Sequence, residues 1–385
     1  MKFAMYYPYL YLRGGIERTI LEQLKSSRNE WTVFTNHYDT IQTFQDLRHF
    51  DIRETPCISV ERSYLKVAFA ALRILKTRLP LSDYGALLVH TEGMGDFITF
   101  ANHEKPIVAY CHTPLKLIHD DAVRKSYLKA NPHLYLPYLL CSRLFRFVDQ
   151  LAWRYYRRVF CNSREVKRRI LRAKLSASEK IEVLHPGVDT EVFVPRGGGY
   201  DYFVHPTRIK WWKNIELAIQ SFNIFCGKNK GDRHFKLIVC GLLDKESIPY
   251  YNRLVKLASN NERIVIITNP KEEEFVRLIQ ESYAVLNTTL NEDWGLVPLE
   301  ANACAKPLIG VCAGGLGESQ TNRETALLVD PTPEQFAEAM LELADNKELV
   351  DVMRRKGRAN ALSYRWEDFS KRIDDYLESV AFTCP

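Results

Sequence analysis

Apolar and polar positions along the chain follow two alternating patterns. Short apolar runs, at residues 2–10, 30–36, 84–91 and 105–114, have the length and composition of buried strands. Between such runs, apolar residues recur at helical spacing, most clearly at residues 65–79. Strands that alternate with helices in this way predict an α/β fold, in which helices cover both faces of a parallel sheet.

The stretch at residues 119–153 departs from this alternation. It is long, aromatic and basic, and it predicts helices around Pro132 and Pro137. A strand and a helix are predicted again directly afterwards, with Asn162 or Ser163 as the helix cap.

A proline followed by three glycines, within residues 194–201, is the strongest linker signal in the chain. The alternation of strands and helices restarts after it and continues to about residue 313, and the last 60 residues are predicted to be helical. We therefore expect two α/β domains, at residues 1–195 and 200–365. Ligands of such sheets bind beyond the carboxyl ends of the strands, so a cleft between the domains is the expected site.

Composition narrows the class of protein. The chain of 385 residues is 46% hydrophobic and 26% charged, which is ordinary for a soluble globular protein, and no apolar run has the length of a membrane span. The first residues lack the small-residue cleavage site of a secretory signal. The nine cysteines form no CxxC pair, and Cys111, Cys161 and Cys240 lie in strand-like contexts. These features predict a cytoplasmic protein with reduced thiols and without a metal site or disulfide framework.

Charge is unevenly distributed. The whole chain carries +6, whereas residues 115–175 hold 15 Lys or Arg and 4 Asp or Glu, a net charge of +11. Three interpretations are open: an anionic membrane surface met by cations and interfacial aromatics, nucleic acid, or a solvated basic face over an aromatic core.

Two acids, Glu292 and Glu300, lie in the sequence NEDWGLVPLEANACAKP. Pro298 suits the first turn of a helix, which places Glu300 in that turn and Glu292 on the preceding loop. Gly295 between them lets a ligand approach the backbone. The acids could form a catalytic carboxylate pair, grip one ligand, or be a solvated acid and an acid that complements the helix dipole.

Two cations, Arg208 and Lys213, follow the first strand of the second half. Cations beside the free N–H groups at the start of a helix form an anion site, and such a site would hold a diphosphate without a metal. The bland alternative is a solvated basic loop. No GxxxxGK[ST] or GxGxxG sequence follows either first strand, which argues against P-loop and dinucleotide chemistry.

Glycines and one histidine complete the candidate set. Gly14 and Gly15 lead into the first helix and let a ligand approach the backbone, and CAGGLGESQ repeats this feature in the second half. His112 stands at the carboxyl end of a strand, where a neutral imidazole could bind a sugar hydroxyl. An ordinary turn and a structural histidine are the alternatives.

The order of these motifs along the chain is what makes them specific. GGxER, CHTP, NSRxV, HPGVDTxxF, Rx4KN, Ex7E, GGxxE and LLVDP occur in turn from Gly14 to about Trp366. This order closely resembles glycosyltransferase family 4, whose members are GT-B enzymes with two Rossmann-like domains facing a cleft and use nucleotide-sugar donors. CHTP and HPGVDT look most like mannosyl- and rhamnosyl-transferases of surface polysaccharides.

The resemblance implies roles for individual residues in the donor half. Arg208 and Lys213 would hold the donor diphosphate, and Glu300 would bind the ribose. Glu292 would hold the donor sugar, and the backbone near Thr268 would contact the base. The same resemblance implies that the further donor-binding residues of this loop are Asn291, Asp293, Trp294, Gly295, Leu296 and Val297.

In the first half, the resemblance places Gly14 and Gly15 at the donor phosphate and His112 at the sugar, near the reacting carbon. It also implies an acceptor-binding first domain and a donor-binding second domain. A final helix at residues 366–382 would cross back to the first domain.

The expected activity is metal-independent hexose transfer with retention of configuration, from a nucleotide-diphosphate sugar to a glycan or lipid-linked acceptor, with mannose favoured. No cofactor and no nucleic-acid partner is expected, and the enzyme would work in the cytoplasm, in part at the inner face of a membrane. Two alternatives remain open: another GT-B enzyme such as a nucleotide-sugar epimerase or a phosphorylase, and a non-catalytic binding protein.

Overall fold

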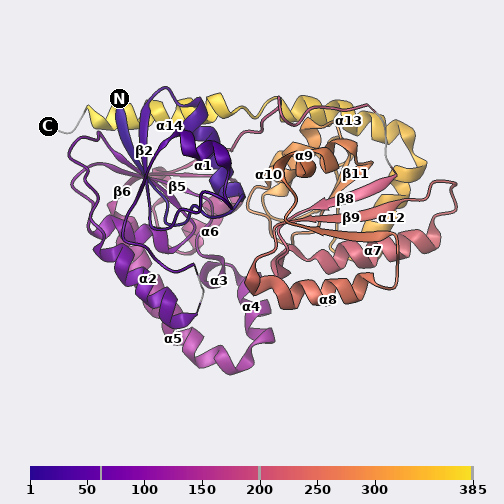
Figure 1. Ribbon diagram of the computed structural model, residues 1–385, viewed down its shortest axis with the longest axis horizontal. Coiled ribbons are helices and arrows are strands. Elements are labelled where there is room, and N and C mark those ends of the chain that lie inside the picture. The colour runs from indigo at the N-terminus through magenta and orange to yellow at the C-terminus, as the bar shows by residue number, and fades with distance from the viewer. Residues whose placement is uncertain (61–62, 198–200, 383–385) are drawn as a thin grey trace. The chain divides into compact units, whose positions relative to one another are not determined.

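The computed structural model describes residues 1–60, 63–197 and 201–382 (Figure 1). The chain divides into two compact units, which we call unit 1 and unit 2. Unit 1 comprises Met1–Pro186 with Trp366–Pro385, and unit 2 comprises Gly187–Arg365. Most of the predicted glycine linker, residues 198–200, lies outside the described residues.

Unit 1 is built on a seven-stranded sheet in the order β3-β2-β1-β4-β5-β6-β7. Every neighbouring pair is parallel. Its strands are β1 Lys2–Tyr6, β2 Glu30–Thr35, β3 Asp51–Glu54, β4 Leu87–Thr91, β5 Ile107–Cys111, β6 Tyr156–Cys161 and β7 Ile181–Val183. The central strands β4 and β5 are buried along their whole length, which explains why they are continuously apolar in the sequence.

Helices cover both faces of the unit 1 sheet, with α1 and α14 on one face and α2 and α5 on the other (Figure 1). The α-helices are α1 Gly15–Ser26, α2 Tyr64–Lys76, α3 Lys116–His119, α4 Asp121–Ala130, α5 Tyr135–Ala152, α6 Arg164–Arg172 and α14 Trp366–Ala381. Short 3-10 helices are η1 Gln45–His49, η2 Met94–Phe100, η3 Pro132–Leu134, η4 Trp153–Tyr155 and η5 Ser178–Lys180. Ser163, rather than Asn162, caps α6, because its side chain accepts a hydrogen bond from the Val166 N–H.

Unit 2 is built on a six-stranded parallel sheet in the order β10-β9-β8-β11-β12-β13. Its strands are β8 Tyr202–Pro206, β9 Lys236–Gly241, β10 Ile264–Thr268, β11 Ala284–Asn287, β12 Leu308–Val311 and β13 Leu327–Val329. Its helices are α7 Ile215–Lys228, α8 Ile248–Ala258, α9 Glu272–Glu281, α10 Leu296–Ala303, α11 Leu316–Ser319, α12 Pro333–Asp345 and α13 Lys347–Ala361, with η6 Trp211–Lys213 and η7 Lys245–Ser247. Two parallel-sheet, Rossmann-like units confirm the predicted α/β fold class.

The boundary between the units lies at Pro186, before the glycine-rich stretch from which we predicted it. Residues 187–193 belong to unit 2 because the chain is anchored there. The Val188 N–H donates to the Tyr364 carbonyl at 3.0 Å, and the Arg358 guanidinium donates to the Phe193 carbonyl at 3.1 Å. The Phe193 ring is fully buried in the core of unit 2.

The last helix, α14, belongs to unit 1. Asp374 of α14 accepts hydrogen bonds from the Ser27 hydroxyl at 2.8 Å and from the Arg28 N–H at 3.1 Å. The Arg28 guanidinium also forms ion pairs at 2.7 Å with Asp375 and Glu378. These contacts join α14 to the loop between α1 and β2.

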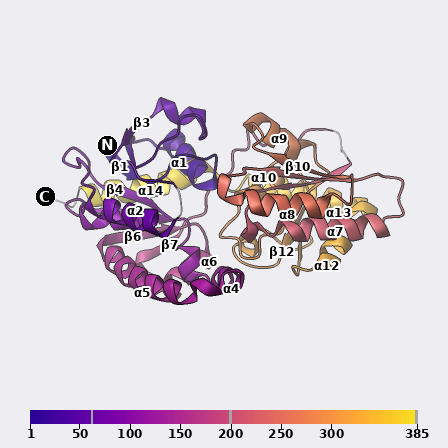
Figure 2. The same cartoon turned by 60° about the horizontal axis from the view of Figure 1, so that its bottom comes forward.

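The basic, aromatic stretch folds into α4, η3 and α5 (Figure 2). Its aromatic residues divide into two groups. Trp153 is a core residue, as are Tyr156 and Phe160 just after it. Exposed apolar side chains lie instead on α5, at Leu136, Leu140, Leu144 and Phe147, together with Tyr135. Among the described residues, no helix is long and apolar enough to cross a membrane.

Candidate functional site

The unit 2 sheet changes direction between β8 and β11. The chain moves outward from β8 through β9 to β10 and then returns to place β11 on the other side of β8. Loops that leave two such neighbouring strands diverge, and the crevice at their carboxyl ends is where α/β sheets bind ligands. Lys213 lies on the connection after β8, and Glu292 lies on the loop after β11.

Lys213 and Glu292 form an ion pair at this switch point. The Lys213 Nζ lies 2.9 Å from Glu292 Oε2, and the two side chains are 18% and 11% exposed. The Asp293 N–H donates to Glu292 Oε1 at 3.3 Å. A carboxylate held at both oxygens has a fixed orientation, so Glu292 is a pre-positioned acceptor rather than a mobile surface acid.

A buried hydrogen-bond chain holds the backbone of Lys213. The Thr288 hydroxyl donates to the Lys213 carbonyl at 2.8 Å, and His205 Nε2 lies 2.6 Å from the same hydroxyl oxygen. Because the hydroxyl proton is committed to the carbonyl, His205 Nε2 carries the proton of that contact. Burial, with a smaller contribution from the Lys213 charge, lowers the pKa of His205 to about 4, so the imidazole is neutral.

Arg208 lies on the same connection, and backbone hydrogen bonds hold the residues on both sides of it. The Thr207 N–H donates to the Cys240 carbonyl and the Ile209 N–H to the Leu242 carbonyl, each at 2.8 Å. The Arg208 side chain is half-buried and makes no hydrogen bond or ion pair within the described part of the chain. Arg208 is therefore an uncompensated cation, in contrast to Lys213.

Gly241, which sequence reasoning missed, sets the path of the Arg208 loop. A Cβ at Gly241 would lie 1.8 Å from the Thr207 carbonyl oxygen and 3.3 Å from the Arg208 nitrogen. No side chain fits in that space, so the loop can approach β9 only because this residue is glycine. The available signal was a glycine at the carboxyl end of a predicted strand.

The loop at residues 291–295 is clamped from its other side by two glycines of CAGGLGESQ. A Cβ at Gly314 would lie 2.4 Å from the Glu292 carbonyl oxygen, and one at Gly315 would lie 2.1 Å from the Asp293 carbonyl oxygen. The Gly315 N–H donates to the Glu292 carbonyl at 2.8 Å. Here the glycines allow a close approach of protein backbone, whereas nothing lies within 4 Å of a Cβ at Gly317.

Helix α10 begins at Leu296, after Gly295 with φ of 84°. The half-buried Leu296 and Val297 supply the first N–H groups of this helix, which lack intrahelical partners and suit an anion or a hydroxyl oxygen. Glu300 is the fifth helical residue, so its predicted place in the first turn is wrong. It is 4% exposed.

The other donor-side candidates occupy different environments. The Trp294 ring is 2% exposed and packs edge-on against Tyr364 with centroids 5.3 Å apart, so the indole is a core group. Asn291 and Asp293 are half-buried on the Glu292 loop, and Thr268 is half-buried at the end of β10. Lys210, a further cation on the Arg208 connection, is buried and paired with Asp244.

His112 follows β5 in unit 1, as predicted, and is 7% exposed. Its Nε2 lies 3.0 Å from Nδ1 of His90, the fourth residue of β4, and His90 Nε2 lies 3.0 Å from Gln23 Oε1. Both His90 and Gln23 are fully buried. Burial holds the pKa of His90 well below its usual value, and His112 contributes to this, so His90 is neutral.

Gly14 and Gly15 lie at the start of α1, where Gly14 is the N-cap and Gly15 the first helical residue. The Gly14 backbone is extended, with φ of −101°, so its conformation does not require glycine. A Cβ at this position would lie 2.6 Å from the Glu17 carboxylate. The lack of side chains at Gly14 and Gly15 therefore keeps the N-terminus of α1 open to a ligand.

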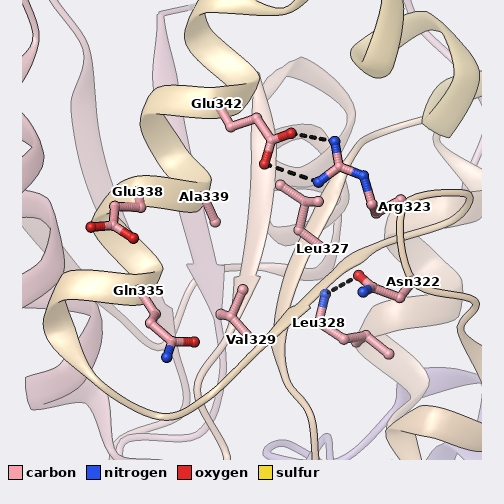
Figure 3. A pocket seen from close by; sticks show the side chains of 9 residues that line it. All are labelled: Asn322, Arg323, Leu327, Leu328, Val329, Gln335, Glu338, Ala339 and Glu342. Atoms are coloured by element: carbon pink, nitrogen blue, oxygen red, sulfur yellow. Dashed lines mark hydrogen bonds and ion pairs between the residues drawn. The ribbon is translucent and has the colours of Figure 1, made fainter.

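A small pocket of about 190 Å³ lies elsewhere in unit 2, at the edge strand β13 and helix α12 (Figure 3). Arg323 and Glu342 pair across it, and none of the predicted site residues lines it. In residues 1–60, 63–197 and 201–382, no group of three or more His, Cys, Asp or Glu side chains is placed to hold a metal ion.

Comparison with known families matches almost the whole chain. The model of glycosyltransferase family 4 matches residues 13–192, and that of glycosyl transferases group 1 matches residues 193–360. A human alpha-1,3/1,6-mannosyltransferase, ALG2, is 24% identical over 95% of this chain and 93% of its own length.

Solved structures share the fold. The sucrose-phosphate synthase of Thermosynechococcus elongatus has a TM-score of 0.80 and 15% identity, and the match covers 100% of both chains. Anabaena Alr3699/HepE, in complex with UDP and glucose, has a TM-score of 0.76 and 17% identity over 98% of this chain and 100% of its own. These likenesses identify the two-domain fold as GT-B.

Proposed function

Because the chain belongs to glycosyltransferase family 4, we propose that this glycosyltransferase moves a hexose, with mannose favoured, from a nucleotide-diphosphate sugar to a glycan or lipid-linked acceptor. Transfer proceeds with retention of configuration and without a metal ion. The observation that carries the proposal is the charged set at the β8–β11 switch point of unit 2. The Lys213–Glu292 ion pair joins the two loops there, and the uncompensated Arg208 lies on the same connection as Lys213.

Glycosyl transfer develops positive charge on the sugar and negative charge on the departing diphosphate. Fixed cations near the diphosphate stabilise that transition state more than the ground state. Arg208 has no internal counter-ion among the described residues and supplies this charge, and Lys213 supplies the second. The first N–H groups of α10 add an oriented dipole, so a divalent ion is not required for charge compensation.

Glu292 and Glu300 have separate tasks in this proposal. Glu292, fixed by Lys213 and by the Asp293 N–H, accepts hydrogen bonds from donor-sugar hydroxyls. Glu300 binds the ribose hydroxyls, and the backbone near Thr268 contacts the base. In unit 1, Gly14 and Gly15 meet the phosphate through the start of α1, and His112 contacts the sugar.

Mannose is favoured because the human relative that aligns over 95% of this chain is a mannosyltransferase. The nucleotide is a separate question, since the Anabaena structure is a complex with UDP and glucose. The decisive experiment therefore titrates the purified chain with GDP-mannose, UDP-glucose, UDP-galactose and the free nucleotides, and measures the midpoint of thermal unfolding.

A nucleotide sugar that binds the folded chain raises this midpoint in proportion to the logarithm of its concentration. The sugar with the largest shift is then supplied with a polyprenyl-linked glycan acceptor, and the anomeric configuration of the product is read by NMR. Absence of any shift across the panel, or a product of inverted configuration, would contradict the proposal. Release of an epimerised nucleotide sugar without acceptor would identify an epimerase instead.

We further propose that the chain works at an anionic membrane surface, at the cytoplasmic face, where a lipid-linked acceptor would be found. On α5, Leu136, Leu140, Leu144 and Phe147 recur at helical spacing and are 61% to 69% exposed. The exposed Arg143 lies within the same stripe, and Lys125 and Lys129 are exposed on α4. An apolar stripe with flanking cations fits the interface of an anionic bilayer better than it fits water.

Vesicle sedimentation tests this surface. We compare neutral phosphatidylcholine vesicles with vesicles that contain phosphatidylglycerol, at low and high salt. Replacing Leu140 and Phe147 by Gln should weaken binding to anionic vesicles by at least about 100-fold, since each large apolar side chain contributes roughly 1.5–3 kcal/mol when fully buried. The control, Leu362→Gln, changes a similarly exposed leucine of unit 2 and should leave binding unchanged. Equal binding by all three proteins would refute the membrane surface.

A further inference from the structure

Helix α3, Lys116–His119, is a single turn that begins four residues after His112. The Leu115 carbonyl accepts from the Ile118 and His119 N–H groups, each at 2.9 Å. A helix of one turn is not stable by itself, because nucleation fixes several residues for very few hydrogen bonds. The conformation of α3 must therefore depend on contacts with other elements.

Helix α5 supplies two of these contacts. The Tyr138 hydroxyl donates to the Leu117 carbonyl at 2.8 Å, and the Arg146 guanidinium donates to the Ile118 carbonyl at 3.0 Å. Both carbonyls belong to the last turn of α3, where backbone carbonyls have no partner within the helix. Two side chains of α5 thus cap the C-terminal end of α3.

A third contact joins the same two helices. His119 Nε2 lies 3.3 Å from Asp149 Oδ2, and the two side chains are 4% and 2% exposed. The helical spacing of Tyr138, Arg146 and Asp149 places them on one face of α5, opposite the exposed apolar stripe. The inner face of α5 therefore holds α3, while its outer face is the proposed membrane surface.

Other elements of unit 1 meet the same segment. The Arg169 guanidinium of α6 donates to the Thr113 hydroxyl at 3.1 Å and lies 3.6 Å from the Asp120 carboxylate, and Arg169 is 3% exposed. Gly93, with φ of 141°, lies after β4, and a Cβ there would be 3.1 Å from the Leu115 Cβ. The residues from Thr113 to Asp120 are thus packed between α5, α6 and the loop after β4.

We propose that Tyr138 and Arg146 of α5 are positioning residues, which keep α3 in its helical turn and thereby fix the segment 112–115 at the carboxyl edge of the unit 1 sheet. The proposal rests on the proposed function for the part that His112 plays in transfer, and not for the support of α3. Hydrogen bonds to the Thr91 carbonyl and from the Asn162 amide hold the His112 backbone itself. The course of the chain after His112 is set by α3.

Hydrogen exchange measured by mass spectrometry tests the support of α3 directly. The N–H groups of Ile118, His119 and Asp120 donate within this turn. They should exchange about tenfold faster in Tyr138→Phe and in Arg146→Met, the effect of one lost hydrogen bond, whereas β4 and β5 should be unaffected. Unchanged exchange of these amides in both variants would overturn the proposal, and this experiment requires neither donor nor activity.

Tyr202→Phe is the matched control. The Tyr202 hydroxyl donates to the Leu278 carbonyl at 2.8 Å, so the control removes the same kind of hydrogen bond from unit 2. It should leave both the exchange of residues 118–120 and the kcat unchanged. Faster exchange of these residues in the control as well would show that the effect of Tyr138→Phe is not specific to α3, and would also overturn the proposal.

Transfer kinetics then connect α3 with His112. Tyr138→Phe combined with Arg146→Met should lower kcat about tenfold, less than the roughly 100-fold effect of a misplacement of about 1 Å. With His112→Ala present, whose slow residual transfer is followed with a radiolabelled donor, the same pair should cost less than about twofold, because a positioning residue acts through the residue that it positions.

A merely structural role of the two α5 residues would cost the same activity in both backgrounds. Such an equal loss, or an unchanged kcat of the combined variant with His112 present, would overturn the positioning role. Absence of transfer by the unsubstituted protein, together with the expected changes in hydrogen exchange, would instead count against the proposed function.

Discussion

Gly241→Ala is the substitution whose effect on activity can be worked out most directly from the structure. The new Cβ would lie 1.8 Å from the Thr207 carbonyl oxygen, whereas such contacts are essentially never shorter than 3.0 Å. The clash is with backbone and not with a flexible side chain. The Thr207–Arg208 segment must therefore move by about 1.2 Å, or β9 must distort by the same amount.

That displacement falls on the residue that carries the uncompensated cation. A misplacement on the order of 1 Å costs about 100-fold in rate, so kcat/KM for the donor should fall roughly 100-fold. Overpacking costs about 1–3 kcal/mol of folding free energy, which lowers the unfolding midpoint by roughly 2–12 °C for a domain of this size. Rates are therefore measured well below the midpoint of the variant.

Gly227→Ala is the matched control for this prediction. Gly227 is exposed near the end of α7, and nothing lies within 4 Å of a Cβ at this position. Alanine favours the helix by up to about 1 kcal/mol, so the control should be slightly more stable and equally active.

A double-substitution cycle separates a local from a global effect. If Gly241→Ala acts by moving Arg208, it should cost little further activity when Arg208 is already alanine. An equal loss of kcat/KM in both backgrounds would refute the argument. So would a Gly241→Ala protein with unchanged donor kinetics.

Three further predictions concern the charged groups. Lys213→Ala and Glu292→Ala should each nearly abolish transfer with an unchanged circular dichroism spectrum. Either single change leaves the other charge of a mostly buried pair uncompensated, so the double variant should regain stability but not activity. Full activity of either single variant would contradict the site. Transfer should persist in excess EDTA, and complete loss there would contradict metal-independent chemistry. Burial raises the pKa of Asp149 to about 8, so the folded chain keeps a proton that the unfolded chain loses, and stability should fall as pH rises from about 4 to 8. Chemical denaturation of Asp149→Asn should lack this component, and identical pH profiles of the two proteins would exclude it.

Strand ends were predictable from the sequence because one rule governs them. In a parallel sheet, the carboxyl ends of the strands share an edge, so an apolar run followed by His112 or by Glu292 places that residue at the edge without knowledge of any contact. Arg208 and Lys213 follow from the same rule applied to β8. The rule needs only the order of elements, which apolar periodicity supplies.

Some residues matter only because two backbone segments pass close together or because two strands pair in a particular register. These residues could not be predicted from the sequence. Gly241 matters because the loop after β8 passes over the end of β9, and this distance is a property of the folded pair. His90 meets His112 because β4 pairs with β5 in the register that sets His90 opposite Tyr110. A single sequence contains the two strands but not their register.

The error at Glu300 has a local cause. We assumed that Pro298 opens the helix, as proline commonly does at the first helical position. Gly295, with its positive φ, instead turns the chain earlier and lets α10 begin at Leu296. Proline is tolerated anywhere in the first turn because those N–H groups have no partners, so its position locates a helix start only to within a turn.

In each unit, a buried neutral histidine contacts a polar group near the carboxyl edge of the sheet. The chemistry of the imidazole ring explains why histidine suits this position. In unit 2, His205 donates to Thr288, which donates to the Lys213 carbonyl, and in unit 1, His90 Nδ1 lies 3.0 Å from His112 Nε2. A hydroxyl alone can rotate and reverse its hydrogen bond, whereas a buried neutral imidazole has one N–H and one lone pair on opposite sides of a rigid ring. Once one nitrogen is committed, the polarity of the other is determined. Burial lowers the pKa of both histidines, which keeps each ring neutral, whereas a protonated ring would donate from both nitrogens.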